Sequence, residues 1–441
     1  MFHNYGKEFN RWEKARNVII LILIAGLAVR FILMPLTSSP PDIAVWAAIN
    51  DGIYSGDTIY GVGHNCYPPI WGYVLSVIGA LTNLAGMGSF GDVFVASYAD
   101  HALTLYTGFL TNLIYTTIVK IPGVIFDILG SLGAYLLVKR ITGDQKKAVM
   151  GFALFFLAPV VIMSSSVLNM FDSMMITLMI FSLLTFMDRK YLLTGILLAL
   201  AVYTKVFALL MIPIMVAYMA SDREISINER MKNILFAAIG FVAVTVIVYL
   251  PTILAGEFID SIYFLTVRMD DYSGFVDSPG YNRIFFFFPM IIAVIVAMFV
   301  IMFIRKTERE KTFFWLTIVS ISLMFSFPLI SYTPTYGITL LPAILLLYSL
   351  KGKIALIPWG LTIAFPLHGI CHYGGTLLYP MGAAGMIDLA NFTVPVDGFI
   401  PGLVIGLMST AGMALIIITL YYVMKKKKEV KSWKSMLTGL E

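Results

Sequence analysis

The chain has 441 residues and a mass of 49.0 kDa, with 59% hydrophobic residues, 12% charged residues and a mean hydropathy of +0.88. Soluble domains carry about 25% charged residues, so this composition excludes a water-soluble globule and indicates a polytopic membrane protein. The formal net charge of +5 does not indicate nucleic acid as a partner, because the cations cluster between apolar runs. The 2 cysteines, Cys66 and Cys371, are too few for a disulfide framework, and the sequence leaves open whether they pair.

Apolar runs predict the membrane segments. A helix crosses about 30 Å of hydrocarbon with roughly 20 residues, and the clear runs are 18–36, 113–138, 148–165, 170–187, 233–253, 284–304, 312–331, 334–350, 354–371 and 400–424. A further run, 191–219, is too long for one straight span and holds Lys205 at its centre. We expect it to form a helical hairpin with Lys205 at its tip. The sequence therefore predicts an all-α bundle of about 12 membrane segments.

The basic residues predict the orientation of the chain. With the N-terminus in the cytoplasm, the inside segments hold 25 of the 30 Lys and Arg residues, as the positive-inside rule requires. The first exterior segment, 37–112, contains no Lys or Arg, so we interpret its apolar stretch 67–84 as an interfacial helix. Both termini are expected in the cytoplasm. The expected membrane is the plasma membrane or, in a eukaryotic cell, the endoplasmic reticulum.

The loops divide the chain into a cytoplasmic N-terminus, two membrane modules and a basic cytoplasmic tail. These parts are 1–17, 18–219, 220–424 and 425–441. The first module includes the exterior loop 37–112, and the second includes the exterior loops 256–283 and 372–399. Because the exterior loops are long and most cytoplasmic loops are short, we expect the active site on the exterior side.

Five charged residues lie within or beside apolar runs: Arg30, Lys120, Asp127, Asp172 and Lys205. A charge inside a bilayer costs about 2.5 to 3.5 kcal/mol on insertion scales, so each one needs a partner or a function. Lys120 and Asp127 share a helix face, and structural pairing with Asp172 or Arg30 would satisfy them. Alternatively, the cations bind an anionic lipid headgroup and the acids hold them in place. Lys205 is the strongest candidate for phosphate binding, the alternative being a snorkelling lysine.

The exterior loops supply further candidates. Arg268 and Arg283 either bind phosphate or pair with nearby acids. Asp42 begins a helix-like stretch just beyond the first span; its carboxylate either accepts a proton from an alcohol or stabilises that helix start. His368 and His372 lie one turn apart without a zinc-binding pattern, so we expect hydrogen bonding to a sugar or headgroup and no metal.

Four groups of short motifs follow one another in a definite order between residues 40 and 215. They are Asp42, Trp46, Gly56-Asp57-Thr58-Ile59-Tyr60 and Tyr67-Pro68-Pro69; Lys120-Ile121-Pro122 and Asp127-Ile128-Leu129; Leu157-Ala158-Pro159 and Asn169-Met170-Phe171-Asp172-Ser173; and Gly195, Thr204-Lys205 and Pro213. In this order the chain resembles the GT-C glycosyltransferases that take a sugar from a polyprenyl-phosphate carrier, such as dolichyl-phosphate-mannose and dolichyl-phosphate-glucose transferases. Two places depart from the family pattern. Ala158 replaces a common Asn, and Asn169-Met170-Phe171 replaces Gly-Gln-x.

The resemblance implies a GT-C-like bundle whose first exterior loop carries interfacial helices above the active site. It implies an inverting, metal-independent hexosyltransferase without cofactors that moves a hexose, with mannose favoured, from a polyprenyl- or dolichyl-phosphate sugar to a hydroxyl. The acceptor would be a glycan, a lipid or a protein. Asp42 would be the general base. Lys205, Arg268, Arg283 and Lys120 would bind the donor phosphate, with supporting roles for Asp127, Asp172, Tyr67, His368 and His372.

Two other functions remain open at this point. A transporter or flippase of lipid-linked or anionic small molecules would also have many spans, and a noncatalytic subunit of a glycan-assembly complex would not need Asp42. The long first exterior segment and the lack of an internal repeat favour the enzyme. The sequence leaves open the sugar, the acceptor, the linkage, the oligomeric state and the role of the C-terminal half.

Overall fold

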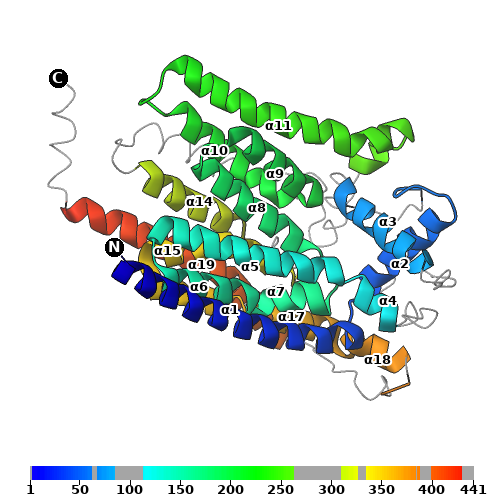
Figure 1. Ribbon diagram of the computed structural model, residues 1–441. Coiled ribbons are helices and arrows are strands. Elements are labelled where there is room, and N and C mark those ends of the chain that lie inside the picture. The colour runs from blue at the N-terminus through cyan, green and yellow to red at the C-terminus, as the bar shows by residue number, and fades with distance from the viewer. Residues whose placement is uncertain are drawn as a thin grey trace.

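The computed structural model describes residues 2–61, 67–84, 113–262, 309–325, 334–383, 385–387 and 399–429. These residues form a bundle of helices (Figure 1). Five helices in the described ranges are long and apolar enough to cross a bilayer: Glu13–Leu36, Leu113–Thr142, Ile227–Leu254, Tyr336–Cys371 and Gly406–Val423. A pair bent by 41°, Gln145–Phe156 with Pro159–Val167, would add a sixth. The all-α membrane class is therefore confirmed, whereas the number of 12 segments stays a prediction.

The bundle has two distinct ends (Figure 1). Helix α1 (Phe2–Leu36) begins, and α19 (Phe399–Glu429) ends, at what we call the termini end. Helices α2 (Pro40–Tyr54) and α3 (Pro69–Leu84) lie at the opposite end, which we call the loop end. The described part of the predicted exterior segment therefore lies across the bundle from the start of α1. An interfacial position for α3, and the side of the membrane that each end faces, stay predictions.

The two membrane helices α5 (Ile121–Thr142) and α6 (Gln145–Phe156) are joined by a short turn at the termini end. Helix α5 ends at Gly143, whose φ of 68° is left-handed and whose N–H bonds to the Lys139 carbonyl. This is a common way for a glycine to end a helix. Asp144 then caps α6, because its side chain accepts from two backbone N–H groups of the first turn. The turn makes α5 and α6 neighbours that run in opposite directions.

Residues 191–219 form the hairpin that the sequence predicts. Helix α9 (Tyr191–Thr204) is followed by the 3₁₀ turn η3 (Val206–Leu210) and α10 (Met211–Ala220), with Lys205 in an extended conformation at the break. The rings of Tyr191 and Tyr218 both contact Phe186, at centroid distances of 5.8 Å and 5.5 Å. Since the two ends of the segment meet, Lys205 lies at its turn.

The stretch from Tyr336 to Cys371 also folds back on itself. As one helix its 36 residues would measure about 54 Å, far beyond the hydrocarbon thickness of about 30 Å. The chain reverses near Gly352, which has a φ of 67°. A Cβ built on Gly369 would lie 3.2 Å from the Cβ of Pro334, so the two ends are adjacent. The predicted segments 334–350 and 354–371 are the legs of this hairpin.

Close helix packing holds the Lys205 hairpin against its neighbour. Helix α11 (Ile227–Leu254) starts with a capping box formed by Ser226 and Glu229. A Cβ on Gly195 of α9 would collide with the Ala237 carbonyl, and a Cβ on Gly240 of α11 would collide with the Leu192 carbonyl. Small residues allow membrane helices to approach in this way.

The remaining described helices complete the bundle. They are α4 (Leu113–Ile118), α7 (Pro159–Ile162), the π-helix η2 (Met163–Val167), α8 (Asp172–Met187), α14 (Arg309–Phe325), η6 (Tyr336–Leu340), α15 (Leu341–Lys351), η7 (Gly352–Ala355), α16 (Leu356–Leu361), α17 (Ala364–Tyr373), η8 (Gly374–Leu378) and α18 (Tyr379–Ala383). The largest apolar core lies between α5, α8, the Lys205 hairpin, α14 and α15. The predicted span 284–304 lies outside the described residues.

Candidate active site

Asp42 occupies a defined place at the loop end. After α1 ends, the Ser38 N–H bonds to the Leu377 carbonyl at 2.9 Å, and α2 begins at Pro40. Asp42 lies in the first turn of α2, is half-buried, and accepts a hydrogen bond from the Ser39 hydroxyl at 2.5 Å. A carboxylate in this position is favoured by the positive end of the helix dipole. Ser39 was not among the predicted site residues, although the Ser-Ser-Pro-Pro sequence before Asp42 marks the turn.

Lys120 holds the loop that carries Asp42. It lies buried between α4 and α5, and its ammonium donates to the Met34 carbonyl at 2.8 Å and to the Thr37 carbonyl. The last carbonyls of a helix lack partners within the helix. Lys120 supplies hydrogen-bond donors to such carbonyls and so caps the C-terminal end of α1. These contacts differ from the donor-phosphate contact that we expected for Lys120.

Lys205 is paired with Asp172. The two side chains are buried, and the Lys205 ammonium lies 2.5 Å from the Asp172 Oδ1. The same ammonium lies 4.6 Å from the Tyr336 ring centroid, 5.6 Å from Phe171 and 5.8 Å from Phe207. Aromatic faces stabilise a cation within about 6 Å. A carboxylate and three rings therefore stabilise the ammonium at the turn of its hairpin; the sequence had no signal for Tyr336.

An aromatic cluster connects Asp42 with Lys205. It consists of Trp46, Tyr67, Trp71 and Phe171, and the Trp46 ring lies 5.5 Å, 5.7 Å and 5.9 Å from the other three. Trp46 follows Asp42 by about one helical turn on α2. Phe171 directly precedes Asp172 and contributes one of the rings around Lys205. Asp42 and the Lys205–Asp172 pair therefore lie at the same end of the bundle, beside one buried cluster.

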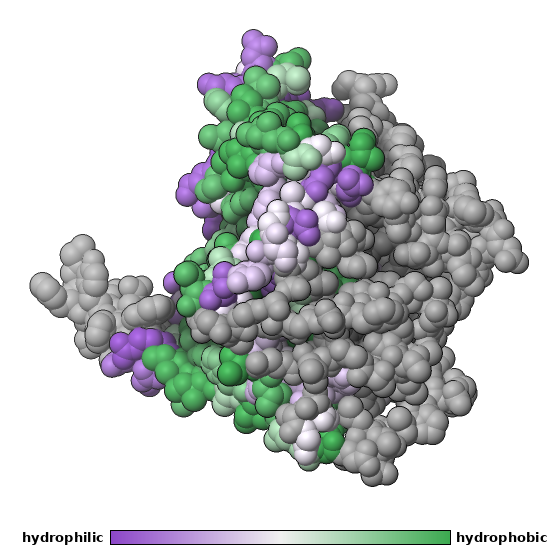
Figure 2. Space-filling view, turned by 90° about the vertical axis from the view of Figure 1, so that its right-hand side faces the viewer, coloured by the Kyte–Doolittle hydropathy of each residue, from purple (hydrophilic) through white to green (hydrophobic). Residues whose placement is uncertain are grey.

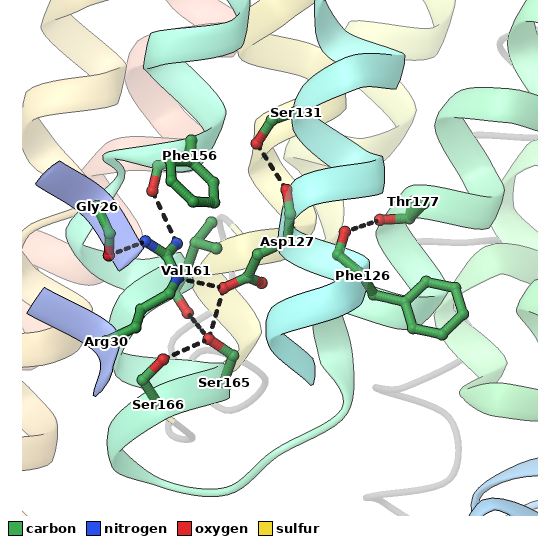
Figure 3. Close-up of polar contacts among 10 residues, drawn as sticks. All are labelled: Gly26, Arg30, Phe126, Asp127, Ser131, Phe156, Val161, Ser165, Ser166 and Thr177. Atoms are coloured by element: carbon green, nitrogen blue, oxygen red, sulfur yellow. Dashed lines mark hydrogen bonds and ion pairs between the residues drawn. The ribbon is translucent and has the colours of Figure 1, made fainter. Parts of the chain in front are cut away.

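Arg30 and Asp127 form a second buried pair, drawn in Figure 3. The Arg30 Nε donates to the Asp127 Oδ2 at 2.8 Å, and both side chains are fully buried. A further Arg30 N–H donates to the Phe156 carbonyl at 2.7 Å, while the Ser165 hydroxyl donates to Asp127 at 2.6 Å. The structural pairing considered for Asp127 is thus present. It joins α1, α5 and η2 inside the bundle.

The π-helix η2 leads into a strained position beside the aromatic cluster. Asn169 has a φ of 60°, a left-handed conformation that favours glycine and, among other residues, asparagine. The Trp46 indole N–H donates to the Asn169 carbonyl at 3.1 Å. Asn169 stands where the resembling family commonly has Gly, so the backbone conformation gives this departure a physical reason.

The structure describes some of the other predicted site residues and not the rest. Tyr67 is buried in the aromatic cluster, and its carbonyl accepts from the Tyr60 hydroxyl at 2.8 Å. His368 is buried on α17. Arg268, Arg283, Cys66 and the side chain of His372 lie outside the described residues. Within the described ranges, no three His, Cys, Asp or Glu side chains gather as a metal site would require.

Several apolar helices with charge pairs buried among them indicate a multi-pass membrane protein. Asp42 and the Lys205–Asp172 pair lie at one end of its helix bundle. Residues 104–249 match the family model described as dolichyl-phosphate-mannose-protein mannosyltransferase. The family is of the GT-C type, so the match supports a membrane glycosyltransferase of that type. It includes Lys120, Asp127, Asp172 and Lys205, and it begins after Asp42. A search of curated proteins found no match to this chain.

Proposed function

We propose that this protein is an inverting hexosyltransferase that acts at the non-cytoplasmic face of the membrane. It moves a hexose, with mannose favoured, from a polyprenyl- or dolichyl-phosphate carrier to a hydroxyl of a glycan, a lipid or a protein. The observation that carries the proposal is the shared position of Asp42 and the Lys205–Asp172 pair beside the aromatic cluster. The description of the matching family supports a dolichyl-phosphate-mannose donor and a protein acceptor.

Asp42 is the proposed general base. Its carboxylate accepts the proton of the acceptor hydroxyl while the acceptor oxygen attacks the anomeric carbon of the donor sugar. The bond between that carbon and the phosphate oxygen breaks, and the configuration inverts because attack and departure occur on opposite faces. The Ser39 hydroxyl, 2.5 Å from the carboxylate, orients Asp42 for this step. Lys120 supports it indirectly, since its two contacts hold the chain that leads into α2.

Lys205 is the proposed cation for the departing phosphate. An ammonium has three donors, and Asp172 accepts one of them and holds the side chain in place. Positive charge aimed at the oxygen where negative charge develops lowers the barrier. Arg268 and Arg283 are proposed as additional phosphate ligands. Tyr67, through the aromatic cluster, and Asp127, through its pair with Arg30, support the site by packing.

A transfer assay tests the role of Asp42. The full chain, reconstituted in vesicles, is given radiolabelled polyprenyl-phosphate mannose or glucose with peptide, lipid and glycan acceptors, and labelled product is counted. Asp42→Asn is expected to lower transfer by about 10² to 10⁴-fold, which is the usual contribution of a general base. Asp57→Asn is the matched control, because Asp57 is an exposed acid that follows the same helix and should keep full transfer.

The same assay tests whether transfer needs the positive charge of Lys205. Lys205→Gln is expected to lower transfer strongly, and Lys205→Arg, which keeps the positive charge, should retain part of it. Transfer that survives Asp42→Asn would remove Asp42 as the base. Equal losses in Asp42→Asn and Asp57→Asn would indicate damage to the fold, and no transfer from either donor to any acceptor would contradict the proposal.

A further inference from the structure

A pocket of about 700 Å³ lies at the opposite end of α9 from Lys205. Its walls come from the turn before α9, the loop before α11 and the first turns of α11. It is therefore at the termini end, a full helix length from the candidate active site. Nothing in the proposed transfer reaction uses it.

Three exposed cations line this pocket: Arg189, Lys190 and Lys232. Within the described residues, the side chain of Arg189 makes no hydrogen bond or ion pair. The Lys232 ammonium lies 5.6 Å from the Phe236 ring. Lys190 lies 3.9 Å from Asp188, a distance at which exposed ion pairs contribute little. All three cations are therefore available to an anion in the pocket.

The two acids of the pocket wall have partners of their own. Asp222 lies 2.6 Å from an Arg309 N–H group, and Glu229 accepts the Ser226 backbone N–H at 3.2 Å as part of the capping box. Burial raises the pKa of Asp222, but hydrogen bonds from Arg309 and from the Glu224 backbone outweigh it and lower that pKa below its ordinary value. Asp222 thus stays ionised beside Arg309, and its charge also attracts Arg189. The pocket wall holds three cations and two acids, so positive charge remains in excess.

Apolar surface adjoins the cations. Leu192, Leu193 and Phe236 of the wall are 46%, 42% and 41% exposed. The exposed face of α11 continues this surface towards the loop end through Ile239, Val242, Val246, Leu250 and Ile253. In Figure 2 green apolar residues gather at the top of the view, where Figure 1 places α11. In a bilayer such a face contacts acyl chains, so the pocket joins a cationic rim to a lipid-facing surface.

We propose that this pocket binds the headgroup phosphate of an anionic phospholipid in the leaflet at the termini end. Arg189, Lys190 and Lys232 contact the phosphate, and the acyl chains lie along α9 and α11. Basic pockets between membrane helices recognise anionic headgroups by this combination. A zwitterionic lipid carries a compensating positive charge, so it is held less well.

Binding of lipids to the purified full chain in neutral detergent, followed by native mass spectrometry, tests this proposal. The probes are phosphatidylglycerol, phosphatidylcholine with the same acyl chains, and glycerol 3-phosphate, which has the phosphate without the chains. Each cation near an anionic lipid contributes about fivefold in affinity. The variant Arg189→Gln/Lys190→Gln/Lys232→Gln is therefore expected to bind phosphatidylglycerol roughly 100-fold more weakly, and Lys232→Gln alone about fivefold more weakly.

The matched control is Lys139→Gln/Lys146→Gln/Lys147→Gln, which removes three exposed cations at the same end, on α5 and α6. It should bind phosphatidylglycerol as the unmodified chain does. Equal losses in the two triple variants would show general attraction to a basic surface and overturn the site. Equal binding of phosphatidylcholine would overturn the anionic selectivity. Tight binding of glycerol 3-phosphate that the pocket variant loses would make this a site for a free phosphate compound.

Discussion

At the scale of single residues, each buried charge of the described chain has a particular partner. Arg30 pairs with Asp127, Lys205 pairs with Asp172, and Lys120 bonds to backbone carbonyls. Removing one member of a buried pair leaves the other charge uncompensated, at a cost of about 3 to 5 kcal/mol. These groups were conspicuous in the sequence because they interrupt apolar runs, but the pairing needed the positions of helices far apart in the chain.

Asn169 gives a prediction at this scale. Its φ of 60° costs an ordinary L-residue about 1 to 2 kcal/mol and costs glycine almost nothing. Asn169→Gly should therefore keep the thermal unfolding midpoint in detergent, and Asn169→Val should lower it. The Asn169 carbonyl can keep its bond from Trp46 in both variants, and both lose the amide, so a difference between their midpoints reports the cost of the left-handed φ. An equal fall in both midpoints would show that the amide side chain, rather than φ, matters.

At the scale of helices, the position of Lys205 depends on how α9 packs. The hairpin is fixed at its base, where Tyr191 and Tyr218 meet Phe186, and along its length, where Gly195 and Gly240 let α9 and α11 touch. The apolar pattern of the sequence predicted the hairpin, because 191–219 is too long for one span and has basic flanks. It did not predict which helix lies against it, since contact between two backbones depends on the shapes of both surfaces.

Gly195→Ala tests this contact. The added methyl group would collide with the Ala237 carbonyl, which is backbone and unable to rotate away, and such overpacking costs about 1 to 3 kcal/mol. The thermal unfolding midpoint should fall. Gly406→Ala is the matched control: Gly406 lies within α19 and a Cβ there meets nothing within 4 Å. Its midpoint should hold or rise, because alanine favours helix by about 1 kcal/mol over glycine. Equal midpoints for the two variants would contradict the close approach.

At the scale of the whole molecule, the two ends of the bundle differ in charge. The described cations of the termini end include Lys139, Arg140, Lys146 and Lys147, whereas the predicted exterior segment 37–112 has no Lys or Arg. The positive-inside rule therefore predicts that the termini end faces the cytoplasm. The structure adds that Asp42 and Lys205 share the other end, so that the orientation of the protein also decides which face holds the candidate active site.

Cysteine labelling tests this orientation. In a chain with Cys66→Ser and Cys371→Ser, Asp57→Cys puts a thiol at an exposed position of the loop end, and Lys147→Cys puts one at an exposed position of the termini end. A membrane-impermeant maleimide added to sealed right-side-out vesicles should label the first variant. The second should be labelled only after the vesicles are opened. The reverse pattern would place the candidate active site in the cytoplasm.

The sequence by itself determined the membrane class, the helical hairpin at 191–219, the separate apolar segments 334–350 and 354–371, and the resemblance to GT-C enzymes that the match over residues 104–249 bears out. These features depend on hydrophobicity and spacing within short stretches. The tertiary structure alone decided that Arg30 pairs with Asp127, 97 positions away in the sequence, and that Lys120 caps the C-terminal end of α1. It also decided that Trp46 and Phe171 connect Asp42 with Lys205. Such contacts depend on how helices distant in the chain pack together, and the local sequence pattern is the same for many packings.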